Sequence, residues 1–370
     1  MKFLKTSKGL RLIAFFLVAV ILICAFGFSA DGWHIKDSTP TPPVNSPSKD
    51  DIEASLPTDG SQSANDTEEK KEEIITPKFY NSLTGEETTE ELSKARHIAF
   101  VMNPAAPMYG VSSADVVIEF PIEDGTTRLL SFINTPKEIV KIGSLSKSRG
   151  YITNLAKALG ATVFSCGNDD TVKYDKCEIN ESLTNEDTVK NYVYTEFARF
   201  TYTSGTLVTN AMSSLKTETH EERVFFQFAP PDASVKGNTV FNKIKIPHSS
   251  LSETALVYSS DNQTYSFDKN GTASGDLING NSLNFKNCFV LFADSTTYEL
   301  QDSTQMILNT IGSGSGYYFT EGTAKQISWS LSKEGVLTLY DESSNELIIN
   351  PGKSYFSFVK SSKINDIVLS

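Results

Sequence analysis

The chain has 370 residues and a formal net charge of −12, and 39% of its residues are hydrophobic. It is too long for one small domain. Its acidic balance argues against a nucleic-acid binder, because binding to phosphates requires clustered lysine and arginine. We therefore expect no nucleic-acid partner.

The first 30 residues have the pattern of a membrane segment. Lysine and arginine within the first eleven residues precede an uncharged apolar run, residues 12–28. As a helix this run would span roughly 25 Å, which approaches the ~30 Å hydrocarbon core of a bilayer. The basic flank keeps the amino end inside the cell and places everything after Asp31 outside the cytoplasm.

We expect residues 1–30 to be an uncleaved transmembrane anchor. Two alternatives stay open: cleavage of a signal segment after Ser29 or Ala30, or lipidation of Cys24 after cleavage. All three place the folded part outside the cytoplasm, held at or released from the cell membrane.

Residues 31–78 form an acidic linker rich in Pro, Ser and Thr, with runs such as DSTPTPPVNSPSKDD and DGSQSANDTEEKKEE. Such a stretch has too few large apolar side chains to offset the entropy cost of ordering it. We expect a disordered tether that spans about 35 to 40 Å on average. It would hold the folded part clear of the membrane.

Residues 79–230 mix strand and helix patterns. The runs IAFVM, VVIEF and LLSFI are rich in β-branched and aromatic residues and predict strands. Apolar residues at helical spacing predict a helix over about 149–159, ended by Gly160, that leads into a buried strand at ATVFS. A second helix is expected within SLTNEDTVKNYVYTEFARF, starting at Thr184. This half should be an α/β domain.

Residues 231–370 have a different texture. Short apolar runs recur at spacings near ten residues and are separated by turns such as DNQ, KNG, NGN and NPGK. This pattern predicts antiparallel β structure. The expected fold class is α+β: an N-terminal α/β domain and a mainly antiparallel β C-terminal domain, preceded by the membrane or signal helix and the linker.

Several longer motifs connect the chain to a known family. In the first half these are LTGEE, ARHIAFVMN, SSADVVIEFPIEDGTTRLLSFI and KIGSLSKSRGYITNLAKALGATVF. In the second half they are IGSGSGYYFTEG, the strand around Trp329 and LYDESSNELIINPGKSYFSFV. Together they resemble the YerB-like family of bacterial surface lipoproteins, which has two domains of unknown function. The resemblance implies an α/β first domain, a mainly β second domain and a place at the membrane.

The chain departs from the family pattern at several polar positions. The family usually has Asp-Asn after its first strand, two arginines in a V-R-S-A-R run, a histidine in an H-A-G-G stretch and a later His-Asn pair. Of the two arginines only Arg149 remains. The other corresponding places hold Asn103, Pro104, Ser146, Ser165, Gly205 and Thr206. If those polar residues form the family's site, this member has lost much of it.

Residues 116–133, VVIEFPIEDGTTRLLSFI, read as a β-hairpin with its turn at Asp124-Gly125. Pro121 has no N–H to donate, so the first strand should be an edge at that point, or bulged. We expect a four-residue loop, which would place three charged side chains on one face, the solvent face. These are Glu119, Glu123 and Arg128.

This charged face has two readings. Glu119 and Glu123 lie four residues apart, about 13 Å along a strand, which is too far for the paired carboxylates of a glycosidase. The residues could be a solvated ion triad centred on Arg128, or a ligand-binding arginine with flanking acids.

Arg149 is expected at the start of a helix, where the helix dipole does not favour a cation. It could serve an anion at the helix N-terminus, or it could pair with a nearby acid such as Asp115 or Glu119. Asn168 and Asp169 follow a predicted strand end, where α/β folds bind ligands; a solvated loop is the alternative.

The cysteines and the remaining motifs point to no chemistry. Cys166 and Cys177 are close enough in sequence to bridge, although buried free thiols are the alternative for these and for Cys288. No exported histidine has a spacing that ties it to Cys166, no Cys/His cluster suits zinc, and GSGSG lacks the lysine of a phosphate loop. We predict no cofactor and no metal, and the catalytic residues, if the protein is an enzyme, stay unknown.

The sequence therefore predicts a membrane-anchored, extracytoplasmic binding or scaffolding protein whose partner is a protein or glycan of the cell envelope. The rival is an envelope hydrolase or transferase that uses Arg149 and carboxylates of the first domain. The candidate ligand-binding residues are Arg149, Arg128, Asp115, Glu119, Glu123, Asn168 and Asp169.

Overall fold

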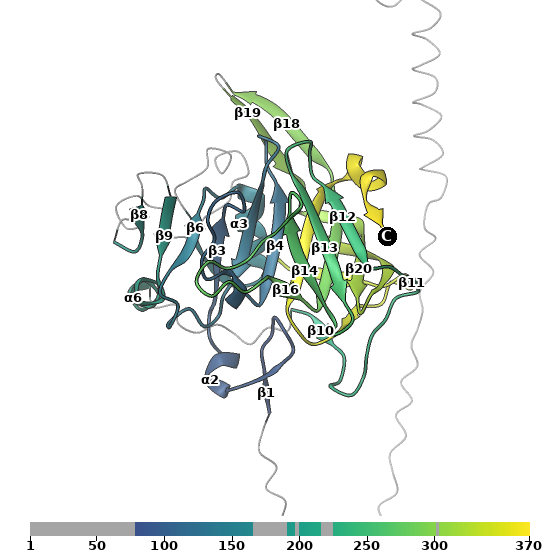
Figure 1. Cartoon of the computed structure of the whole chain (residues 1–370), viewed down its shortest axis with the longest axis horizontal. Helices are drawn as coiled ribbons and strands as arrows, with labels where there is room; N and C mark the ends of the chain where they lie inside the picture. Colours follow the sequence, from purple (N-terminus) through teal and green to yellow (C-terminus); the bar gives the residue numbers. More distant parts are fainter. Residues whose placement is uncertain (1–77, 166–190, 197–199, 216–224, 301–302) are drawn as a thin grey trace, which may run out of the picture. The chain divides into compact units, whose positions relative to one another are not determined.

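A computed structural model describes residues 78–165, 191–196, 200–215, 225–300 and 303–370 (Figure 1). They belong to one compact unit, residues 73–370. Several predicted features lie outside this described part. They are the membrane segment, nearly all of the linker, the candidate ligand residues Asn168 and Asp169, and the cysteines Cys166 and Cys177. Within it, no helix is both long and apolar enough to cross a membrane.

One large sheet contains thirteen of the described strands and runs through both halves of the chain. From the first half come β3 (His97–Met102), β4 (Val116–Pro121), β5 (Thr127–Phe132), β6 (Ile142–Leu145), β7 (Ala161–Phe164), β8 (Tyr194–Glu196) and β9 (Phe200–Thr203). From the second half come β11 (Thr239–Val240), β17 (Asn287–Ala293), β20 (Gly312–Thr320), β21 (Thr323–Leu331), β22 (Leu337–Tyr340) and β24 (Ser354–Lys360). The main path is β11-β21-β20-β17-β24-β4-β5-β3-β6-β9-β8, with β22 beside β21 and β7 beside β3.

The two halves meet in the middle of this sheet. β24 of the second half lies parallel to β4 of the first, with Ser354 paired to Val116 and Ser357 paired to Glu119. β24 also lies parallel to β17 on its other side. The halves predicted as separate domains thus share one sheet, because a strand from each supplies the backbone partners of the other.

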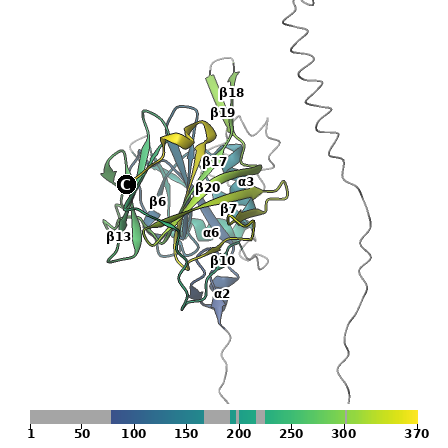
Figure 2. The same cartoon turned by 90° about the vertical axis from the view of Figure 1, so that its right-hand side faces the viewer.

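A second sheet of six strands is built from the second half alone, in the order β15-β14-β13-β12-β25 with β16 beside β14. Its strands are β12 (Lys243–Pro247), β13 (Glu253–Ser259), β14 (Thr264–Lys269), β15 (Thr272–Ala273), β16 (Asn284–Phe285) and β25 (Val368–Leu369). Three two-stranded sheets pair β1 (Phe79–Tyr80) with β2 (Glu87–Thr88), β10 (Gln227–Phe228) with β23 (Ile348–Ile349), and β18 (Ser295–Leu300) with β19 (Ser303–Leu308). Figures 1 and 2 show β18 and β19 projecting beyond the rest of the fold.

Helices are few among the described residues, and the fold is mostly β. The α-helices are α2 (Glu90–Ser93), α3 (Gly150–Ala158) and α6 (Gly205–Leu215), and the 3-10 helices are η1 (Val111–Ser113) and η2 (Ser361–Asp366).

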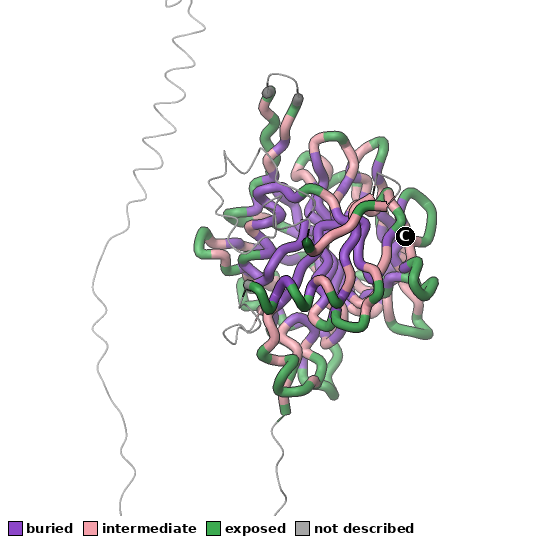
Figure 3. The backbone as a smooth tube through the Cα atoms, turned by 90° about the vertical axis from the view of Figure 1, so that its left-hand side faces the viewer, coloured by how far each residue is buried: buried purple, intermediate pink, exposed green. Residues whose placement is uncertain are grey.

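Two hydrophobic cores lie on the two faces of the large sheet, and Figure 3 shows their buried backbone inside the fold. Successive side chains of a strand point to opposite faces, so β4 contributes to both. On one face its side chains pack with α3 and with the second-half strands of the large sheet: Ile118, Phe120, Ile152, Leu155, Phe356 and Trp329. On the other they pack with the six-stranded sheet and α6: Val117, Leu129, Val208, Leu256 and Phe267.

The structure confirms most predicted elements of the first half and corrects one. The helix expected over 149–159 is α3, and the strand after Gly160 is β7. The expected second helix is wrong where the structure describes it, because Tyr194–Glu196 and Phe200–Thr203 form the antiparallel strands β8 and β9. Their aromatic residues pack at the end of the sheet, where Tyr194 lies against Tyr202.

The hairpin forms with a different register from the one expected. The backbone N–H of Ile122 donates to the Thr126 carbonyl and that of Gly125 to the Ile122 carbonyl, while Gly125 has a φ of 79°. These bonds define a three-residue loop with a left-handed residue at its end. An odd loop length shifts the pairing by one residue, so Glu119 faces Leu129 and Phe120 faces Arg128. A one-residue shift moves the side chains of one strand to the opposite face relative to the other.

β5 and β24 flank β4 on either side, but β24 pairs only with residues 116–119, so β4 is an edge at Pro121 as expected. Pro121 is tolerated because the pairing with β24 ends at Glu119, two residues earlier. The N–H group that proline lacks is therefore not needed for a hydrogen bond to β24.

Candidate functional site

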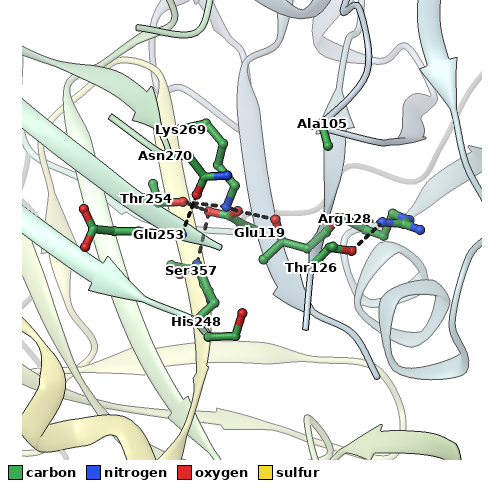
Figure 4. Close-up of polar contacts among 12 residues, drawn as sticks. Ala105, Glu119, Thr126, Arg128, His248, Glu253, Thr254, Lys269, Asn270 and Ser357 are labelled. Carbon is green, nitrogen blue, oxygen red and sulfur yellow. Dashed lines mark hydrogen bonds and ion pairs between the residues drawn. The ribbon is translucent and has the colours of Figure 1, made fainter. Parts of the chain in front are cut away.

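Glu119, expected on the solvent face, is fully buried between the two sheets. Its Oε1 accepts hydrogen bonds from Thr127 Oγ1 at 2.6 Å and Lys269 Nζ at 2.5 Å. Its Oε2 accepts from Thr254 Oγ1 at 2.7 Å and the Tyr355 hydroxyl at 2.5 Å. Each carboxylate oxygen thus has two donors, and Figure 4 shows Glu119 at the centre of the contacts with Thr254 and Lys269. The expectation of a solvated Glu119 was wrong because the register and the second sheet were not known.

His248 completes this polar cluster. Its Nε2 lies 3.3 Å from Glu119 Oε2 and 3.5 Å from Ser357 Oγ. Its Nδ1 is buried and has no hydrogen-bond partner among the described residues. Burial alone would raise the pKa of the Glu119 carboxyl, but the Lys269 ammonium and His248 outweigh it and hold that pKa well below its usual range.

The cluster joins the two halves of the chain, and its donors occupy both oxygens of the Glu119 carboxylate. Glu119 and Thr127 come from the first half, and the other partners come from the second. A carboxylate with four donors has no lone pair available for a substrate. A buried ion pair of this kind needs these hydrogen bonds, because removing each charge from water costs on the order of several kcal/mol. We therefore interpret it as a structural junction.

A second junction forms around Asp276, which lies in the connection between β15 and β16. Its Oδ1 accepts from the backbone N–H of Gly110 at 3.0 Å and of Ile278 at 2.9 Å. Its Oδ2 accepts from the N–H of Ser112 at 3.0 Å and from Ser112 Oγ at 2.8 Å. This buried carboxylate fastens a loop of the second half to the 3-10 helix η1 of the first.

Arg128 lies on the face opposite to Glu119, as Figure 4 shows. Its Nη1 donates to Thr126 Oγ1 at 3.2 Å and to the Thr127 carbonyl at 2.9 Å. Burial lowers the pKa of its guanidinium, partly offset by the nearby Asp124 carboxylate. The expected triad of Arg128 with Glu119 is therefore not formed, because the shifted register separates the two side chains.

Arg149 is held by Glu123. Arg149 Nε donates to Glu123 Oε2 at 3.0 Å, and Nη2 contacts Oε1 of the same carboxylate. Both side chains are largely buried, with 9% and 14% of their surface exposed. Arg149 precedes α3 and its Nη1 also donates to the Ser148 carbonyl at 3.0 Å. A two-bond arginine–carboxylate pair is strong and directional, so the acid partner of Arg149 is Glu123 and not Asp115 or Glu119.

Asp115 is engaged elsewhere. Its Oδ2 accepts from Asn81 Nδ2 at 3.1 Å, and burial raises the pKa of its carboxyl. Asp115 and Glu119 thus lie apart from the Arg149–Glu123 pair, whereas Arg128 lies near enough to that pair for both charges to act on its guanidinium. Asn168 and Asp169 lie outside the described residues.

An open groove lies beside the β1–β2 hairpin, where the described part of the chain begins. It consists of two adjoining cavities of about 440 Å³ and about 510 Å³ that share Tyr80, Gly85 and Pro231. The first cavity is lined by apolar side chains, including Phe79, Tyr80, Phe226, Phe228, Pro230 and Pro231. The second is lined by charged residues, including Glu86, Glu87, Asp232, Lys286 and Glu321. A cavity of this size with an apolar wall is a common form of binding site.

The LTGEE motif shapes the groove. The N–H of Gly85 donates to the Asn81 carbonyl at 2.7 Å, which closes the turn between β1 and β2. Gly85 has a φ of 68°, and a Cβ atom there would lie 2.3 Å from the Phe228 ring. Only glycine lets the turn adopt this conformation against that ring. The motif therefore positions the aromatic wall.

Neither the partners of Glu119 nor the groove could be predicted from the local sequence pattern. Lys269 and Tyr355 lie 150 and 236 residues away from Glu119, too far for any local pattern to connect them. For the groove two signals were present: the LTGEE motif has a glycine in a turn, and three phenylalanines, Phe225, Phe226 and Phe228, precede the Pro230–Pro231 pair.

The large sheet shared by both halves, the second sheet and the open groove define a mostly β protein with a candidate binding site and no assembled catalytic centre among its described residues. The chain belongs to the YerB-like family: residues 83–220 match the N-terminal domain of the protein of unknown function DUF3048, and residues 244–356 match its C-terminal domain. The crystal structure of the YerB protein from Bacillus subtilis is similar, with a TM-score of 0.68 and 18% sequence identity, and the match covers 79% of this chain and 99% of that chain. At this identity the likeness shows the fold. No curated protein matches the sequence.

Proposed function

We propose that this protein is a membrane-anchored, extracytoplasmic binding or scaffolding module of the bacterial cell envelope, and that the groove beside β1 is its ligand site. The apolar run 12–28 with its basic flank supports the anchor and the orientation. The composition of residues 31–78 supports a disordered tether. The finer division into an α/β first domain and a mainly antiparallel second domain belongs to the same proposal.

The observation that carries the proposal is the contrast between the charged candidates and the groove. Glu119, Glu123 and Arg149 are buried or nearly so and are bonded to other residues of the chain. In the groove, by contrast, Tyr80 keeps 46% of its surface exposed. Aromatic side chains that are partly exposed in a concave site are typical anchors for a ligand.

The contacts favour binding over a hydrolase or transferase built on Arg149. Such an enzyme needs Arg149 and a carboxylate to face a substrate in one pocket. Here Glu123 occupies the guanidinium of Arg149 with two contacts, and the oxygens of Glu119 are saturated with donors. No contact among the described residues favours the rival reading.

The location is tested with the full chain carrying a C-terminal epitope tag. We expect the tag in the membrane fraction, resistant to extraction by high salt, and accessible to protease added to spheroplasts. A soluble cytoplasmic tag, protected from protease, would contradict the proposal.

The binding role is tested by capture from solubilised envelope. We expect the full chain to retain an envelope protein or glycan that residues 1–77 alone do not retain, and the substitution Tyr80→Ser to reduce this capture. The matched control is Leu251→Ser, because Leu251 is 65% exposed and lies outside the groove lining. Equal recovery by wild type and by residues 1–77 would count against a binding role.

A further inference from the structure

The groove has two chemically different halves that meet at Tyr80, Gly85 and Pro231. In the apolar half, the rings of Phe226 and Phe228 meet edge to face, with 6.2 Å between their centroids. The acidic half is lined by four carboxylates and one lysine, Lys286. A ligand that fills both halves must combine an apolar segment with positive charge.

The polar side chains of the apolar half are already committed to the protein. Asn81 accepts from the Leu83 N–H at 2.9 Å and donates to Asp115. Ser82 Oγ lies 2.9 Å from His97 Nε2, and Ser93 Oγ donates to the Glu90 carbonyl at 2.8 Å. A glycan needs donors and acceptors for its hydroxyl groups, and these are already engaged. The aromatic rings and prolines are what this half offers to a ligand.

The acidic half has carboxylates in excess. Glu321 pairs with Lys286 at 2.9 Å and with Lys236 at 3.5 Å, and Glu87 pairs with Lys78 at 3.0 Å. Glu86 and Asp232 are exposed, and neither has an ion pair within the described part of the chain. Two unpaired carboxylates beside an apolar wall complement a basic side chain.

We propose that the groove binds an extended, proline-rich peptide segment of another protein, with a basic residue next to the prolines. Grooves lined by aromatic side chains bind such segments because the polyproline II conformation is formed before binding and loses little entropy. The proline rings would pack on Tyr80 and Phe228, and the basic residue would face Glu86 and Asp232. This inference rests on the proposed function and names its class of ligand.

The test measures binding of a fluorescein-labelled peptide, GPPLPPRG, to the purified full chain in detergent by fluorescence anisotropy. We expect saturable binding that Tyr80→Ser weakens at least about tenfold, because partly exposed aromatic anchors carry much of the affinity. The double substitution Glu86→Lys and Asp232→Lys should weaken it by a similar factor and reduce its salt dependence. Leu251→Ser should leave it unchanged.

A second probe, GPPLPPEG, separates charge recognition from apolar contact. We expect wild type to bind it more weakly than GPPLPPRG and the double lysine variant to reverse this order. Thermal unfolding is measured for each variant and for wild type. Equal unfolding temperatures show that a variant that binds less peptide is still folded. Tyr80 and the two acids are surface side chains, so these variants should fold.

Several outcomes would overturn the peptide inference. They are no binding of either peptide, binding that is indifferent to Tyr80→Ser, or competition by a chitooligosaccharide, which would make the groove a glycan site. If envelope capture still depends on Tyr80 in these cases, the proposed binding function stands and only its ligand class is wrong. If capture fails as well, the proposed function fails with it.

Discussion

Glu119 of the first half and Lys269 of the second form a buried ion pair, with 2.5 Å between Oε1 and Nζ. The pair lies between the large sheet and the six-stranded sheet, and β24 pairs with β4 alongside it. Together with the Asp276 junction it makes each half depend on polar partners supplied by the other.

Removing the charge of Glu119 should destabilise the protein strongly. In Glu119→Gln the Lys269 ammonium would stay buried without a counter-charge, which costs about 3–5 kcal/mol. Urea unfolding followed by circular dichroism measures the free energy of unfolding. The matched double variant, Glu119→Leu with Lys269→Met, removes both charges and should therefore lose less free energy of unfolding than Glu119→Gln. A single variant as stable as wild type would show that the pair is not formed.

The stabilisation from Glu119 should disappear in acid. Lys269 and His248 hold its folded-state pKa below the unfolded value of about 4.3. A lowered pKa contributes stability that is fully present above the unfolded pKa and is lost as pH falls through the folded pKa. The stability difference between wild type and Glu119→Gln should therefore be constant from pH 7 to 5 and shrink towards pH 3. A difference that does not change over this range would refute the assignment.

The substitution Asp276→Asn should weaken the second junction. All four groups that contact the Asp276 carboxylate are hydrogen-bond donors. The amide NH₂ of asparagine would therefore face a donor where the carboxylate oxygen accepts a hydrogen bond. A buried donor left without an acceptor costs about 1–3 kcal/mol. Urea unfolding gives the loss, and Asp261→Asn, at an exposed turn, is the control. Equal stability of both variants would contradict the role of Asp276.

The pairing of Arg149 with Glu123 can be separated from the expected Arg128–Glu119 contact by double-mutant cycles. For Arg149→Ala and Glu123→Ala we expect a coupling energy of about 0.5–3 kcal/mol, as for residues in direct contact. For Arg128→Ala and Glu119→Gln we expect coupling near zero, because the three-residue loop puts these side chains on opposite faces. If the coupling energy in the second cycle were as large as in the first, the four-residue loop would be correct and the observed register wrong.

Neither half should fold alone. Without residues 231–370, β4 loses its partner β24 and Glu119 loses Lys269, His248 and Tyr355. We expect residues 78–230 to lack a cooperative thermal transition, and co-expression with residues 231–370 to restore a stable complex. A cooperative transition in the isolated first half would show that the shared sheet is dispensable.

Several elements of the fold could be predicted from local sequence. Ile152, Leu155 and Ala156 recur at helical spacing and pack in the core as expected of α3. Alternation in VVIEF correctly indicated a strand with two distinct faces. The prediction that Arg128 shares a face with Glu119 was wrong, because loop length decides register and the Asp-Gly turn is compatible with loops of three or four residues. Nothing local separates these two cases.

The sequence by itself determined the positions of most strands, the helix α3 and the turn at Asp124-Gly125, because short-range periodicity and turn chemistry act within a few residues. Only the tertiary structure decided what the charged residues do. Strand pairing across 236 residues brings Tyr355 to Glu119, and the second sheet brings Lys269 and excludes water. The same carboxylate that reads as solvated in one strand becomes a buried junction when a distant sheet covers it, since burial and partners are properties of the whole fold.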